Sequence, residues 1–177
     1  MSSKYLYIGL PRWERSWRFR RLEVDGAPEA RPSFDKYFLD IAAAVAARGD
    51  CIRCKVGAVL VERDTHRIIS TGYNGSPPGG PSCLRGECPR CLGDAPSGSN
   101  YEGCIEIHAE DNCLRYANLY HPDRAGHWGW TVTMYVTRRP CEICRPMLID
   151  QQVDGVVYPD PPAGYVWENT RVWYGGR

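Results

Sequence analysis

The apolar residues of the segment 34–48 recur with the period of a helix, at Phe34, Tyr37, Phe38, Ile41, Ala42 and Val45. That spacing places them along one side of a helix that packs on a core. Ser33 is suited to cap the N-terminus of this helix, and Gly49 is suited to end it. The pattern therefore predicts the first core helix over residues 34–48.

Two short runs rich in β-branched residues follow, at 56–62 and 67–71. The polar segment between them, Arg63 to His66, has the composition of a turn, so the two runs predict a β-hairpin. A histidine at such a turn is expected to be solvated and not to bind a metal, so we do not assign a ligand role to His66.

Helix and strand patterns alternate in the second half of the chain, with helices predicted at 106–118 and 141–151 and strands at 131–137 and 153–158. Strand–helix–strand connections after an antiparallel hairpin predict an α/β fold. We expect a mixed central sheet of four to five strands with helices packed on it.

The chain has 177 residues, enough for one domain with a proper core. We predict an N-terminal extension at 1–33, a domain at 34–158 with a cysteine-rich loop insert at 75–105, and a short aromatic and proline-rich tail at 159–177 with at most one strand near 171–174. The extension interleaves aromatic and basic residues, which suits either single-stranded nucleic acid or an arm packed on protein. The absence of a basic stripe elsewhere favours the arm.

The charge is balanced, with 22 Lys and Arg against 21 Asp and Glu. This balance argues against recruitment of nucleic acid or of an anionic membrane by a global field. No apolar run approaches the length of a membrane span, and the segment Met1 to Leu10 is too short and polar for a signal peptide, so we expect a cytoplasmic protein. The nine cysteines are odd in number and closely spaced, which favours metal binding over disulfides.

The chemistry centres on His108-Ala109-Glu110 and on Pro140-Cys141-Glu142-Ile143-Cys144. His108, Cys141 and Cys144 supply three ligands of a tetrahedral zinc ion and leave the fourth position open to water, as catalysis requires. On a helix, His108 and Glu110 would lie about 200° apart and could not chelate one metal together. Glu110 is therefore the candidate for proton transfer. A lone CxxC fits a redox pair or a structural metal equally well, but H-x-E followed by P-C-x-x-C is the signature of zinc nucleobase deaminases.

Four stretches together closely resemble the deoxycytidylate (dCMP) deaminases. They are Cys51-x-x-x-Lys55-Val56-Gly57-Ala58-Val59, Gly72-Tyr73-Asn74-Gly75-Ser76-Pro77, His108-Ala109-Glu110-x-Asn112 and Met134-Tyr135-Val136-Thr137-x-x-Pro140-Cys141-x-x-Cys144. The resemblance covers residues 34–158, and the second stretch separates the dCMP branch from other cytidine-deaminase-like enzymes. It implies a three-layer cytidine-deaminase-like fold.

The resemblance implies hydrolysis of dCMP to dUMP and ammonia, which supplies thymidylate synthesis. Zinc on His108, Cys141 and Cys144 would activate water, and Glu110 would move its proton to the ring nitrogen and the leaving amine. The implied substrate contacts are Asn74 to the sugar, backbone groups near Ala109 and Arg139 to the pyrimidine, and Arg138, Arg139 or Arg145 to the phosphate.

The resemblance also implies a second, structural zinc on Cys51 and Cys83. Cys88 and Cys91 could complete a four-thiolate site, Cys104 competes for a place, and free thiols are the alternative. The two other cysteines outside the catalytic motif, Cys54 and Cys113, have the character of small core residues. Relatives further suggest a homo-oligomer and the effectors dCTP and dTTP, although Leu119 stands where some regulated members have an arginine.

Three other functions compete with dCMP deamination. The substrate could be another cytosine nucleotide or a modified pyrimidine, because atypical loops line the pocket. A polynucleotide substrate is disfavoured by the neutral charge balance. A zinc-stabilised binding module without catalysis would have no need of Glu110, an acidic residue outside the ligand set.

Overall fold

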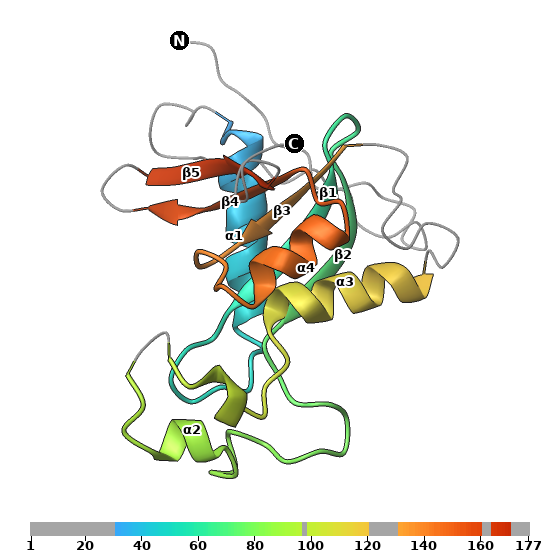
Figure 1. The fold of residues 1–177 in the computed structure, drawn as a ribbon. Coiled ribbons are helices and arrows are strands. Elements are labelled where there is room, and N and C mark those ends of the chain that lie inside the picture. The colour runs from blue at the N-terminus through green and yellow to red at the C-terminus, as the bar shows by residue number, and fades with distance from the viewer. Residues whose placement is uncertain (1–30, 97–98, 121–130, 161–163, 171–177) are drawn as a thin grey trace, which may run out of the picture. The chain divides into compact units, whose positions relative to one another are not determined.

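The computed structural model describes residues 31–96, 99–120, 131–160 and 164–170, and the folded elements belong to one compact unit, Ser33–Arg177. Its elements in chain order are α1 (Phe34–Ala46), β1 (Gly57–Glu62), β2 (Arg67–Tyr73), α2 (Pro89–Leu92), the 3₁₀ turn η1 (Tyr101–Gly103), α3 (Ala109–Tyr120), β3 (Val132–Val136), α4 (Cys144–Asp150), β4 (Gly155–Asp160) and β5 (Gly164–Asn169) (Figure 1).

The five strands form one sheet in the order β2-β1-β3-β4-β5. Strands β3 and β4 pair in parallel, and the other three neighbouring pairs are antiparallel. Leu60 at the centre of β1 lies opposite Ser70 of β2 and Met134 of β3, which fixes the register of the middle of the sheet. The predicted α/β class and mixed sheet are confirmed.

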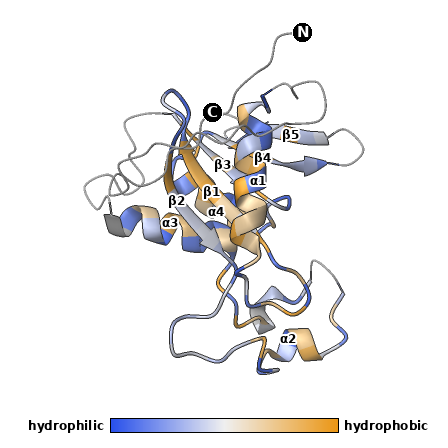
Figure 2. Ribbon diagram, turned by 180° about the vertical axis from the view of Figure 1, so that it is seen from behind, coloured by the Kyte–Doolittle hydropathy of each residue, from blue (hydrophilic) through white to orange (hydrophobic). Residues whose placement is uncertain are grey.

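Alternate residues of the central strands face two separate cores, as the pleat of a sheet requires. Val59 and Val61 pack with α1 on one face, whereas Leu60 and Met134 pack with α3 and α4 on the other. The two views show the helices on opposite sides of the sheet, with hydrophobic residues gathered on its central strands (Figures 1 and 2). The fold is therefore the three-layer arrangement that was expected.

The first helix and the hairpin follow the sequence pattern closely. The Oγ of Ser33 accepts a hydrogen bond from the backbone N of Lys36 at 3.2 Å, so the predicted cap is present, and α1 ends at Ala46, two residues early. His66 is exposed in the hairpin turn with a φ of 57° and stacks on the ring of Phe34. Among the described residues, His66 belongs to neither group of potential metal ligands.

Both helices that carry the catalytic motif begin later than predicted. Helix α3 begins at Ala109, not at residue 106, because Ile107 exchanges two backbone hydrogen bonds with Gly75. Helix α4 begins at Cys144 and not at Cys141. His108 therefore precedes its helix, although the pattern placed it in the first turns.

The C-terminal part adds the fifth strand that the proline content had put in doubt. Strand β5 pairs with β4 from Gly155↔Asn169 to Asp160↔Gly164, and Pro159 lies next to the last of these pairs, where a missing N–H is tolerated. The strand expected near 171–174 lies outside the described residues, as do residues 1–30 of the extension.

None of the described helices combines the length and the apolar character needed to cross a lipid bilayer.

Candidate active site

His108, Cys141 and Cys144 converge at one point in the structure, as the sequence predicted. The Nδ1 of His108 lies 3.4 Å from the Sγ of Cys141 and 3.2 Å from that of Cys144, and the two sulfurs are 3.7 Å apart. Ligand atoms around a tetrahedral zinc ion are roughly 3.6 to 3.8 Å from each other, given the usual Zn–N and Zn–S bond lengths. The three side chains therefore fit a zinc ion with one position left for a small molecule.

Backbone contacts on both sides hold these ligands in place. The bridge between Gly75 and Ile107 fixes the residue before His108, and the carbonyl of His108 accepts from Asn112 N at 3.0 Å as α3 begins. On the other side, the carbonyl of Cys141 accepts from the backbone N of Cys144 and of Arg145, both at 3.1 Å. The metal ligands therefore stand in two turns, each of which leads into a helix.

The electrostatics of the cluster suit a metal cation. A hydrogen bond from Cys144 and the adjacent imidazole lower the pKa of the Cys141 thiol to about 3. The same shared proton raises the pKa of Cys144 above its ordinary value, and the contact with Cys141 raises that of His108. The low pKa favours the thiolate form of Cys141, which is the form in which cysteine binds zinc.

Glu110 lies beside the cluster in the first turn of α3 and is only 5 % exposed. Burial raises the pKa of its carboxyl group above the usual range, so a proton is held there more readily than on a surface carboxylate. Helix α3 reaches this position because Gly72 of β2 lets it approach, since a Cβ at Gly72 would lie 2.3 Å from the backbone N of Cys113.

A pocket of about 590 Å³ opens over the cluster, a volume suited to a small-molecule ligand. The predicted substrate contacts Asn74, Ala109, Arg138 and Arg139 all line it, together with His108, Glu110 and Cys141. Arg145 is not among the residues that line it, and its Nη1 pairs instead with Glu142 at 2.7 Å. Proximity in sequence grouped three arginines, but only Arg138 and Arg139 line the pocket.

Asn74 is 7 % exposed and lies in the pocket wall. Its Oδ1 accepts from the backbone N of Val56 at 2.7 Å, and its Nδ2 donates to the carbonyl of Cys54 at 2.9 Å. Through these two hydrogen bonds, the side chain holds the segment before β1 in place.

Several pocket residues escaped the sequence analysis, namely Arg53, Cys54, Arg90, Tyr101, Glu106 and Glu142. Burial and the neighbouring Asp50 raise the pKa of Glu106 to about 7. Cys54 was predicted to be a core residue, but it is half-buried in the pocket wall and accepts a contact from Arg138 Nη1 at 2.9 Å. Cys113, by contrast, is fully buried in the core, as predicted.

A second group of thiols forms where the insert meets the segment before β1. The sulfur atoms of Cys51, Cys83 and Cys91 all lie within 4.8 Å of one another, and those of Cys51 and Cys91 are 3.6 Å apart. Cys88 is fully buried beside Cys91, and Cys104 packs at the edge of this group. All nine cysteines are free thiols. We call Cys51, Cys83, Cys88 and Cys91 the cysteine centre.

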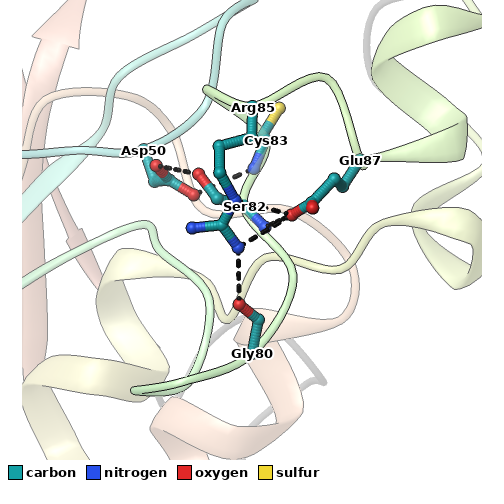
Figure 3. Close-up of polar contacts among 6 residues, drawn as sticks. All are labelled: Asp50, Gly80, Ser82, Cys83, Arg85 and Glu87. Carbon is teal, nitrogen blue, oxygen red and sulfur yellow. Dashed lines mark hydrogen bonds and ion pairs between the residues drawn. The ribbon is translucent and has the colours of Figure 1, made fainter.

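Polar contacts close the loop around the cysteine centre (Figure 3). The Asp50 carboxylate accepts from Ser82 Oγ at 2.9 Å and from Cys83 N at 3.0 Å, and Arg85 pairs with Glu87. The backbone N of Ile52 donates to Cys83 Sγ at 3.5 Å. Burial, and then the neighbouring thiols, raise the pKa of Cys91, so these thiols ionise together only if a cation compensates their charge.

Residues 32–159 match the family model described as the cytidine and deoxycytidylate deaminase zinc-binding region, which is well over half of the chain. A deoxycytidylate deaminase of Mycobacterium phage D29 is 44% identical over 135 residues, which are 73% of this chain and 97% of the phage protein. The deoxycytidylate deaminase of Saccharomyces cerevisiae is 39% identical over 137 residues, 77% of this chain. The chain spans only 40% of that yeast protein.

Among solved structures, the dCMP deaminase of cyanophage S-TIM5, crystallised with dCMP and dUMP, matches with a TM-score of 0.52. The two sequences are 22% identical, and the match covers 73% of this chain and 83% of the cyanophage chain. At that identity, the likeness concerns the fold.

Proposed function

The chain belongs to the family of cytidine and deoxycytidylate deaminases, and from that premise we propose that it hydrolyses dCMP to dUMP and ammonia. The observation that carries the proposal is the cluster of His108, Cys141 and Cys144 beside the buried carboxyl group of Glu110, in one pocket. The high identity to the deoxycytidylate deaminase of phage D29 over nearly its whole length supports the choice of dCMP.

A zinc ion on these three ligands would supply a Lewis acid that lowers the pKa of water to near neutrality. Glu110 is not needed as a ligand, and we propose that it takes a proton from the attacking water. It delivers this proton to the ring nitrogen N3 as the bond from C4 to oxygen forms. It then takes the second proton from the new hydroxyl group on C4 and delivers it to the amine, which leaves as ammonia when its bond to C4 breaks. Its burial favours this role, because burial raises the pKa of the carboxyl group and makes it a stronger proton acceptor than a surface carboxylate.

We also propose that the cysteine centre holds a second, structural zinc ion. The sulfur atoms of Cys51, Cys83 and Cys91 lie within 4.8 Å of one another, and the CxxC turn of Cys88 and Cys91 is typical of structural zinc ligands, so these four thiols offer the ligands of a closed tetrahedral site. Cys104 packs against the same group and competes with Cys88 for the fourth position. Regulation by dCTP and dTTP, homo-oligomerisation and a cytoplasmic location stay predictions.

The proposal is tested by incubating the purified, zinc-loaded protein with dCMP, CMP, dCTP and deoxycytidine, and their 5-substituted forms. Chromatography of the products and an ammonia assay measure turnover. We expect the highest kcat/KM for dCMP. Preferential turnover of a 5-substituted nucleotide would favour the alternative of a modified pyrimidine substrate, and no turnover of any substrate would overturn deamination itself.

A further inference from the structure

The phosphate of a nucleoside monophosphate needs a cation in the pocket, and four arginines line it, namely Arg53, Arg90, Arg138 and Arg139. Three of these use one Nη group on another protein group. Arg53 Nη1 donates to the carbonyl of Arg90 at 3.3 Å, Arg138 Nη1 donates to Cys54 Sγ at 2.9 Å, and Arg139 Nη2 pairs with Glu168 at 3.3 Å. None of these three arginines therefore has both Nη groups clear of protein contacts.

Arg90 differs because the protein contacts only the Nε edge and one face of its guanidinium group. Its Nε donates to the carbonyl of Ser99 at 2.7 Å, and its Cζ lies 4.7 Å from the centroid of the Tyr101 ring. Its two Nη groups donate to no acceptor among the described residues. An arginine held in this way presents the planar fork that binds phosphate oxygens.

The position of Arg90 relative to the metal ligands suits a nucleotide. The ring of Tyr101 stands between Arg90 and His108, and its centroid is 5.1 Å from that of the histidine. The guanidinium of Arg90 therefore lies within about 10 Å of the His108 ring. One nucleotide spans this separation, with its base over the metal ligands and its phosphate toward Arg90.

The cysteine centre fixes the backbone of Arg90. Arg90 lies between Cys88 and Cys91, in a turn closed by the hydrogen bond from Cys91 N to the carbonyl of Cys88 at 3.1 Å. The sulfur of Cys91 contacts Cys51, and the carbonyl of Arg90 accepts from Arg53 Nη1 at 3.3 Å. The same two cysteines that fit a structural zinc thus hold a pocket arginine between them.

We propose that Arg90 binds the phosphate of the substrate and that the cysteine centre positions it there. The proposal rests on the proposed function and deepens it. In this arrangement the insert selects phosphorylated substrates, and the second thiol group contributes to substrate choice as well as to stability.

The test measures binding by calorimetry in a Glu110→Gln background, where turnover does not interfere, with dCMP and deoxycytidine as the two ligands. Arg90→Gln should weaken dCMP binding by about 10- to 100-fold, the range expected for loss of a charge-assisted contact, and should change deoxycytidine binding by less than about twofold. Arg85→Gln is the matched control, since Arg85 lies in the same insert but not in the pocket wall, and it should bind dCMP like the parent.

Unchanged dCMP affinity in Arg90→Gln would overturn the proposal, and so would an equal loss for both ligands, which would indicate a general structural defect. Failure of the proposed function has a separate signature, because the parent protein would then neither bind nor deaminate dCMP.

The positioning role is tested with Cys91→Ser, which should weaken dCMP binding more than deoxycytidine binding. If this variant does not fold, Cys51→Ser gives the same comparison, because it removes the thiol that contacts Cys91. A variant that folds and keeps the parent ratio of the two affinities would show that the cysteine centre does not position Arg90.

Discussion

The molecule carries two groups of thiols that look alike in sequence and differ in surroundings. His108, Cys141 and Cys144 stand at the starts of α3 and α4, next to the sheet and beside a buried carboxyl group. The cysteine centre stands on loops and on the short helix α2, is braced by Asp50, and consists of thiols alone. Three protein ligands leave a metal open to substrate, whereas four close it. The difference teaches that the number and kind of ligands, and not the CxxC spacing, separate a catalytic site from a structural one.

The largest effect is expected from a change at Glu110, beside the catalytic ligands. Glu110→Gln should lower kcat by about 10³-fold or more, because the amide cannot take up the proton of the attacking water. Steady-state assays with dCMP measure the loss, and atomic emission should find the zinc content unchanged. Turnover near the parent rate would show that another group moves the proton.

The next largest effect is expected from a change in the cysteine centre. Cys83→Ser should remove one of two zinc ions per chain and lower the free energy of unfolding by about 3 kcal/mol, because metal binding at such a site contributes folding energy. At saturating dCMP, the kcat of the folded fraction should stay within about threefold of the parent value. Urea denaturation measures the folded fraction, so that the rate can be expressed per folded molecule.

Cys144→Ser is the reciprocal variant. It should keep the metal of the cysteine centre while losing activity. The assignment of catalysis to one centre and of stability to the other is wrong if the parent protein contains one zinc ion per chain. It is also wrong if Cys83→Ser stops turnover without destabilising the fold.

A smaller effect tests the residue that lies between the two centres. Asn74→Ala should lower the free energy of unfolding by about 2 kcal/mol, because it removes the partners of the half-buried Val56 N–H and the Cys54 carbonyl. Chemical denaturation measures this change, and the KM for dCMP should rise as the pocket wall loosens. A rise in KM with unchanged stability would assign Asn74 to substrate contact alone.

The smallest effect comes from the surface of the insert. Arg85→Gln removes an exposed ion pair with Glu87 (Figure 3) and should shift the thermal midpoint by about 1 °C or less. Its kcat/KM should equal that of the parent. A large loss of stability would mean that polar contacts, and not the thiols, hold the insert.

Local patterns were enough to predict α1 and the hairpin, because each depends on residues close together in sequence. The grouping of His108 with Cys141 and Cys144, more than thirty positions away, came instead from the H-x-E and P-C-x-x-C signature. The start of α3 was misplaced because its limit is set by the pairing of Ile107 with Gly75, more than thirty positions earlier. The strand β5 was doubted because Pro159 suggested a break, yet a proline near the end of a pair costs little.

The pocket itself was harder to predict than the metal ligands. Arg90 and Tyr101 belong to a loop without periodicity, so the direction of their side chains depends on the thiols that fold the loop. Cys54 was assigned to the core because cysteine is usually buried, and no sequence pattern shows that its neighbour is Arg138. Arg145 was grouped with the pocket by proximity in sequence, but it follows the first residue of α4 and pairs with Glu142.

The chain order of the two thiol groups has a consequence for biosynthesis. The last member of the cysteine centre is Cys91, and the catalytic set is complete only at Cys144. At translation rates of about 5–20 residues per second, the ribosome finishes the first group roughly 3 to 10 s before the second. If the cysteine centre holds the proposed zinc ion, all of its thiols exist before the catalytic cysteines have been synthesised, so the two sets of ligands need not compete for the same ion.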